Sequence, residues 1–300
     1  MIRRHNIMNE YFETYRGAVM PVHCDVVEHM TIASYYERLA DAYVSFTERM
    51  GLGAEFRKNE RRAFAAVRTF SSLKQELRAG DTLHMEGGVA GAEGKLLRFC
   101  NNIFNTATGD LVSTFESHAI HFDLDGRRAV EIPAETRAKI DAHLVDWESP
   151  IVDRWYPETT EGFIPTLRDS VKMWELDILG HLSAHFYIQR FSQACMQAMT
   201  AVGMTPHYNR DNRRNMSTFE LDVRYLKELH GGDTVTVKSA VTDIGNSSIR
   251  FVHSMIKEAT GETVATMSQY GAFLDMDARK STPMPDDIRQ KAQALLVTPG

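Results

Sequence analysis

Two aspartates in this sequence each precede a histidine by four residues, and each pair stands just ahead of a segment with helical periodicity. The pairs are Asp25 with His29 and Asp177 with His181. A carboxylate beside a helix N-terminus can attack a carbonyl carbon, or activate a water molecule to do so. The N–H groups of the first helical turn can stabilise the oxyanion that then develops. The spacing therefore favours acyl-transfer chemistry, which requires neither a metal nor an organic cofactor.

Structural interpretations of the same residues stay open. An aspartate ahead of a helix is often an N-cap that stabilises the helix by about 0.5–2 kcal/mol, although capping does not require a histidine four residues later. The two histidines could be core residues with satisfied hydrogen bonds. Cys24 lies beside Asp25, but Leu176 stands at the equivalent position of the second pair, so we expect the cysteine to pack rather than to react.

Both pairs belong to a repeat with a constant offset of 152 residues, as in Asp25 and Asp177. The other matches include Tyr35 and Tyr187, Arg38 and Arg190, Gly51 and Gly203, Glu76 and Glu228, Leu77 and Leu229, Asp81 and Asp233, Arg98 and Arg250, and Pro133 and Pro285. A single offset over so many ordered matches indicates two duplicated domains without net insertions.

Each copy has the same order of predicted elements. Apolar residues three or four apart predict a long helix over residues 35–50 and 187–202, ended by Gly51 and Gly203. Because Arg190 is the one charged residue within 187–202, we expect this second helix to be largely buried. Short helices are expected to begin near Pro133 and Pro285. Strands are predicted over residues 63–77, 81–90, 95–106 and 111–123, and over 216–229, 233–243, 247–258 and 262–275.

An antiparallel sheet wrapped around the long helix of each copy is the natural packing, so the predicted fold class is α+β. We place the first domain at residues 1–147, a proline-containing linker at 148–166 and the second domain at 167–300. The length of 300 residues and the hydrophobic share of 43% allow each domain a core of its own.

Composition excludes several classes of protein. The net charge of −6 lacks the basic footprint of nucleic-acid binding. No apolar run reaches the length of a membrane span, so no membrane association is expected. Three cysteines without the spacing of a disulfide framework or a metal site favour the reducing cytoplasm.

The second motif reads Trp174, Asp177, Gly180, His181 and Tyr187 in an aromatic-x-x-Asp-x-x-Gly-His pattern. Together with the element order, it resembles the 4-hydroxybenzoyl-CoA thioesterase superfamily, which has the hotdog fold. That resemblance implies a tandem acyl-CoA thioesterase whose two domains pack as an internal pseudo-dimer, with homo-oligomers possible. The expected substrate is an acyl-CoA or acyl-carrier-protein thioester, and no cofactor is implied.

The first motif, Asp25, Glu28, His29 and Met30, is similar to a thioesterase subgroup linked to carnitine and betaine breakdown. Glu28 stands where the family has glycine; it either adds a second carboxylate or marks a site that has lost activity.

The resemblance also implies roles for site residues. Asp25 and Asp177 would be the nucleophile or general base, and His29 and His181 would orient the substrate or the carboxylate. The backbone around Thr31 and Ser183 would polarise the substrate carbonyl. The remaining residues expected at the substrate are Glu28, Gly180, Tyr35 and Tyr187, and for the two tyrosines packing of the helix is the competing interpretation.

Two other functions stay open on the same fold. A hotdog enoyl-CoA hydratase or dehydratase is the nearest rival enzyme, although the prolines of those motifs are missing here. A non-catalytic acyl-CoA-binding protein is the alternative from another class, and the retained Asp25 and Asp177 argue against it.

Overall fold

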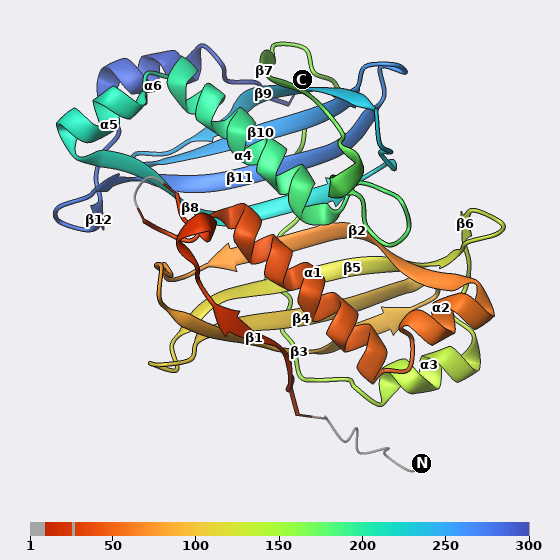
Figure 1. The fold of residues 1–300 in the computed structure, drawn as a ribbon. Helices are drawn as coiled ribbons and strands as arrows, with labels where there is room; N and C mark the ends of the chain where they lie inside the picture. Colours follow the sequence, from red (N-terminus) through yellow and green to blue (C-terminus); the bar gives the residue numbers. More distant parts are fainter. Residues whose placement is uncertain (1–9, 26–27, 300) are drawn as a thin grey trace, which may run out of the picture. The chain divides into compact units, whose positions relative to one another are not determined.

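The chain divides into two compact units between Ile151 and Val152. The computed structural model describes residues 10–25 and 28–299. Figure 1 shows in each unit a sheet with one long helix lying across its face. The linker predicted at 148–166 spans the division and stays a prediction.

The first unit contains one antiparallel sheet in the order β1-β3-β4-β5-β2. Its strands are β1 (Phe12–Ala18), β2 (Arg62–Leu73), β3 (Thr82–Glu93), β4 (Leu96–Asn105) and β5 (Leu111–Asp123), and the short β6 (Arg128–Ala129) pairs with β5. Its helices are the 3-10 turn η1 (Pro21–His23), the long α1 (Ile32–Arg49), α2 (Ala54–Glu60) and α3 (Ala134–Asp141).

The second unit repeats this plan in the order β7-β9-β10-β11-β8, again antiparallel. Its strands are β7 (Ile164–Ser170), β8 (Arg214–Tyr225), β9 (Thr234–Ile244), β10 (Ser248–Lys257) and β11 (Thr263–Asp275), with β12 (Lys280–Ser281) beside β11. Its helices are η2 (Met173–Glu175), the long α4 (Ala184–Ala201), α5 (Pro206–Asn212) and α6 (Asp286–Gln293). The predicted α+β class and the tandem arrangement are confirmed.

The short helices differ from the sequence prediction in two details. The short helices α2 and α5 were not predicted, because seven residues make too few turns for a periodic apolar pattern. Pro133 and Pro285 are N-cap residues with extended ψ, one position before the first helical turn.

The prediction that the second long helix is largely buried is wrong. Tyr187, Ile188 and Phe191 are buried on α4, but Gln189 and Gln193 face solvent. Uncharged glutamines form part of the solvent-exposed face of α4, so the number of charged residues does not reveal that face. α1 has the same two-sided character.

The inner face of each sheet packs against its long helix. In the first unit Phe46, Leu97 and Phe99 belong to one buried cluster, and Val89 and Ile140 extend it to β3 and α3. In the second unit the equivalent cluster contains Ala198, Val241, Phe251 and Ile288. Burying this apolar surface stabilises each unit at roughly 25 cal/mol per Å².

A row of hydrogen-bonded polar side chains lies in the core of the second unit. Ser239 Oγ lies 2.6 Å from Thr166 Oγ1 and 2.7 Å from His253 Nδ1, and His253 Nε2 has no hydrogen-bond partner. His253 is fully buried, and burial lowers its pKa from 6.5 to about 3. At the repeat-equivalent position the first unit has Asn101, which lies 3.2 Å from Thr14.

We predict that His253→Asn makes the fold less sensitive to acid. The unfolded chain takes up the His253 proton below its ordinary pKa of 6.5 but the folded chain does not, so stability falls as pH decreases from 6.5 toward 3. Between pH 7.5 and pH 5 the variant should lose about 2 kcal/mol less unfolding free energy than the wild type. Urea unfolding at both values measures this, with the exposed His207→Asn as control. Equal losses in the wild type and His253→Asn would contradict the burial argument.

Candidate functional site

The second motif forms a small closed loop between η2 and α4. The Asp177 N–H donates to the His181 carbonyl at 2.7 Å, and a Leu176–Leu182 bridge closes the loop beyond them. Asp177 Oδ1 accepts hydrogen bonds from the N–H groups of Leu179 and His181, at 2.8 and 3.1 Å. One oxygen of the exposed carboxylate therefore fixes the shape of the loop.

The described residues of the first motif make the same closing contacts. The Asp25 N–H donates to the His29 carbonyl at 2.8 Å, and Asp25 Oδ1 accepts from the His29 N–H at 3.0 Å. Glu28 has a φ of 66° and Gly180 a φ of 80°, so this position of the loop has the left-handed conformation in both units. Glycine adopts that conformation without steric cost, which explains the glycine of the second motif.

The interpretation of the aspartates as N-caps is wrong. The N-cap residues are Thr31 and Ser183, six residues further on. Their own N–H groups donate to the carbonyls of His23 and Glu175, at 2.8 and 2.9 Å. The N–H groups available to a ligand are therefore those of the following residues, such as Ile32 and Ala184, which begin each helix without an intrahelical acceptor.

The motif histidines contact a residue that sequence reasoning did not assign to the site. His181 Nε2 lies 3.3 Å from Glu228 Oε2, and His29 Nε2 lies 3.2 Å from Glu76 Oε2. Both histidine side chains are mostly buried. The signal was present, because Glu76-Leu77 and Glu228-Leu229 recur in the repeat. Each unit thus pairs the motif histidine with a glutamate, on the loop that the motif aspartate shapes just ahead of the long helix.

Tyr35 and Tyr187 are buried side chains of α1 and α4. Burial raises the pKa of Tyr187, and the nearby negative charge of Asp177 raises it further. Burial raises the pKa of Tyr35 in the same way. Both phenols therefore stay protonated and pack behind the motif, Tyr187 with its ring edge-on to Tyr225.

A hollow of about 540 Å³ in the second unit lies elsewhere, among β7, β9 and α4. Its lining includes Thr166, Arg168, Gln193 and Glu258, and none of its lining residues belongs to the motif. The chemistry of the motif, rather than this hollow, therefore defines the candidate site.

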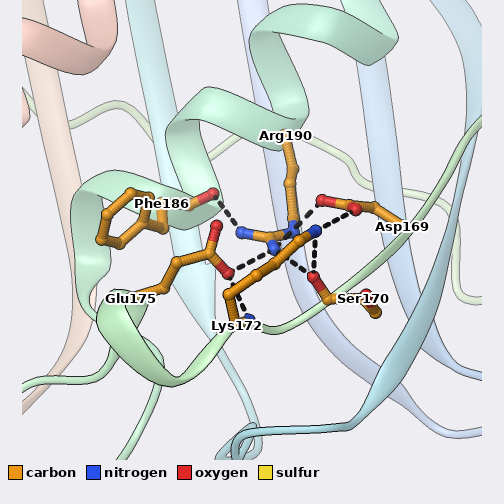
Figure 2. A network of polar contacts seen from close by, with 6 residues as sticks. All are labelled: Asp169, Ser170, Lys172, Glu175, Phe186 and Arg190. Atoms are coloured by element: carbon orange, nitrogen blue, oxygen red, sulfur yellow. Dashed lines mark hydrogen bonds and ion pairs between the residues drawn. The ribbon is translucent and has the colours of Figure 1, made fainter.

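A buried ion network holds the second motif against its helix (Figure 2). Arg190 of α4 is 1% exposed, and its Nη2 contacts Glu175 Oε2 at 2.7 Å and Asp169 Oδ2 at 3.0 Å. The same nitrogen donates to the Ser170 carbonyl at 2.8 Å. Although burial opposes ionisation, contacts with Lys172 and Arg190 lower the pKa of Asp169. The network joins β7, η2 and α4.

The first unit has Arg38 at the equivalent position, with fewer anions around it. Arg38 Nη2 lies 2.9 Å from His23 Nε2, and the guanidinium stacks over the Tyr15 ring at 5.6 Å. His23 stands where the second unit has Glu175, and Gly17 stands where it has Asp169. The two units support the same loop with different chemistry.

We predict that Arg190→Met destabilises the second unit by about 3–5 kcal/mol, because the buried Glu175 would lose its cation while Asp169 keeps only Lys172. Arg38→Met should cost clearly less, since Arg38 contacts the His23 ring and an exposed carboxylate, Glu37, rather than a buried one. Urea unfolding of both variants measures the difference. Equal costs would mean that the carboxylates of the network contribute little.

The left-handed position gives another prediction. A Cβ added at Gly180 meets nothing within 4 Å, so Gly180→Ala is penalised by backbone conformation alone. We expect a loss of about 1 kcal/mol in unfolding free energy. Glu28→Gly should not destabilise the first unit, because glycine tolerates the φ of 66° already present. A neutral Gly180→Ala in thermal or urea unfolding would show that the loop relaxes.

The two units each match the same family of known proteins. The model of the thioesterase-like superfamily matches residues 19–140 and again 171–292. A betainyl-CoA thioesterase from Pseudomonas aeruginosa is 20% identical over 152 residues, which cover 51% of this chain and 83% of the relative. An L-carnitine dehydrogenase/betainyl-CoA thioesterase from a Rhizobium species is 24% identical over 156 residues. That match covers 51% of this chain but only 31% of the longer relative.

Among solved structures, a protein from Lactobacillus plantarum assigned as an oleoyl thioesterase superposes with a TM-score of 0.73 at 14% identity. The superposition covers 90% of this chain and 98% of that protein, so the tandem fold is shared along nearly the whole length. The duplicated motif, the two hotdog units and the repeated family match lead to one conclusion: the chain belongs to the thioesterase-like superfamily.

Proposed function

We propose that this chain is a thioesterase that hydrolyses an acyl-CoA or acyl-carrier-protein thioester. The observation that carries the proposal is the repeated assembly of Asp, His and Glu at the start of each long helix. The names of the matched relatives support the same reaction class.

The proposed reaction begins with water held by the motif aspartate. Asp177 Oδ1 is engaged by the loop N–H groups, so the carboxylate is fixed in place while it accepts a proton from that water. The water oxygen bonds to the thioester carbon, and the carbon–sulfur bond then breaks. The thiolate leaves and is protonated to the free thiol, and the acyl group leaves as a carboxylic acid. In the alternative mechanism, the carboxylate attacks the thioester carbon directly and displaces the thiolate. Water then hydrolyses the resulting anhydride.

The helix N-terminus would stabilise the oxyanion. The N–H of Ala184 in the second unit, and that of Ile32 in the first, point outward from the start of a long helix with partial positive charge. His181 would orient the substrate, since its ring is held by Glu228. No step of this scheme requires a group that the chain itself lacks.

The acyl group is proposed from the relatives. Both carry betainyl-CoA thioesterase in their names, and the first motif is similar to the carnitine and betaine subgroup. Betainyl-CoA is therefore the first substrate to test, beside short, long and aromatic acyl-CoA esters. We also propose the cytoplasm as the compartment, and among the described helices none is both long and apolar enough to cross a membrane.

We predict that Asp25→Asn together with Asp177→Asn reduces turnover by about 10²–10⁴-fold, the usual contribution of a general base. Release of free thiol from the acyl-CoA panel measures the rate. Each single variant reports the share of its own unit. Asp110→Asn, an exposed turn residue, is the matched control and should keep wild-type turnover.

Unchanged turnover in the double variant would exclude the aspartates. If acyl-CoA binds to the wild type but no thiol is released from any ester, the non-catalytic binding protein would be favoured. Loss of enoyl absorbance from crotonyl-CoA without thiol release would favour the hydratase.

A further inference from the structure

A group of metal-ligating side chains lies beside the second motif. His181, Glu228 and His230 each offer one ligand atom, and these three atoms lie within 4.8 Å of one another. The rings of His181 and His230 are edge-on, with centroids 5.0 Å apart. His230 is the most exposed of the three, with 52% of its side chain accessible, so its ring can rotate.

The backbone explains why the three side chains converge. Leu229 is fully buried, and its carbonyl accepts the Leu182 N–H at 2.8 Å. Its two neighbours are less buried, Glu228 in part and His230 on the surface, and both offer a ligand atom near His181. The hydrogen bond places this pair against His181, the residue before Leu182. The arrangement is built into the loop that carries the motif.

The first unit contains the same segment with one decisive difference. Arg78 stands at the repeat-equivalent position of His230, and its Nη2 lies 2.9 Å from His29 Nε2. Glu76 lies on the other side of the same ring nitrogen, at 3.2 Å. The first unit therefore supplies its own cation beside the histidine that its glutamate contacts. In the second unit an imidazole, which can bind a metal ion, stands at the position of that guanidinium.

We propose that His181, Glu228 and His230 form a binding site for one divalent transition-metal ion, and that Zn²⁺ matches it best. Two imidazoles and a carboxylate are a recognised ligand set for zinc. Bonds of 2.0–2.1 Å in tetrahedral geometry separate ligand atoms by about 3.4 Å. His181 Nε2 and Glu228 Oε2 are already 3.3 Å apart, and rotation of His230 brings in the third ligand. The remaining position of the ion is open to solvent or to a bound anion.

The metal takes the place that a guanidinium holds in the first unit. A bound ion would also coordinate the His181 imidazole, which orients the substrate in the proposed hydrolysis. Metal binding would therefore inhibit hydrolysis in the second unit. The binding site itself does not depend on the proposed hydrolysis, because the ligands and their geometry are independent of any substrate.

The test is titration of the full, chelator-treated chain with ZnCl₂ by isothermal calorimetry. We expect one high-affinity equivalent in the wild type. His230→Arg, which copies the first unit, should weaken that binding by more than about 100-fold, beyond the effect of losing an outer-shell partner. Arg78→His should add a second equivalent, since it completes the same ligand set around His29 and Glu76.

His207→Arg is the matched control, because it makes the same exchange at an exposed histidine of α5. It should keep one equivalent, and circular dichroism confirms that each variant is folded. Retention of the tight equivalent in His230→Arg, or its absence from the wild type, would overturn the proposal. A single equivalent in Arg78→His would contradict the claim that this position decides which unit binds the ion. Because calorimetry detects the ion directly, the result is independent of thioesterase activity.

Discussion

Each candidate site depends on one backbone hydrogen bond between the motif loop and the segment that follows the first long strand of the meander. Met30 N–H donates to the Leu77 carbonyl at 2.7 Å, and Leu182 N–H donates to the Leu229 carbonyl at 2.8 Å. The two leucines are buried and fix the segment in the core. In the sequence each glutamate stands more than 40 positions from its histidine. This hydrogen bond holds the two segments together, so that the glutamate contacts the histidine.

Much of the fold could be predicted from the sequence. Apolar periodicity is visible within a single segment, and the repeat is supported by many matches along the chain. The long helices, the order of the elements along the chain and the tandem organisation follow from them. The glutamates at 76 and 228 were visible as repeated residues, but their role depends on a long-range contact that no spacing rule describes. The role of the aspartates in shaping their own loop was likewise hidden, since an N-cap and a loop carboxylate have the same sequence context. The packing of the two domains as a pseudo-dimer stays a prediction.

Duplication without insertions lets the two units be compared residue by residue. The scaffold is retained, while polar positions have diverged at Gly17 and Asp169, His23 and Glu175, Arg78 and His230, and Asn101 and His253. In each of these pairs the second unit carries the residue that can gain or lose a proton near neutrality or in acid, and in three of the four pairs the first carries one that cannot. At Glu28 and Gly180 the exchange runs the other way, so the two units differ in their titratable groups although the closing contacts of the motif loop are common to both.

The exposed indole of Trp174 makes the difference between the two units accessible to fluorescence measurements. Trp174 lies three residues before Asp177 and is 79% exposed, whereas Val22 occupies the equivalent position of the first unit. The other two tryptophans are less accessible: Trp155 is 41% exposed, and Trp147 donates its indole N–H to the buried Glu116. A water-soluble quencher would reach Trp174 first. Quenching of the most accessible tryptophan fluorescence would consequently report chiefly on the second motif, with no added label.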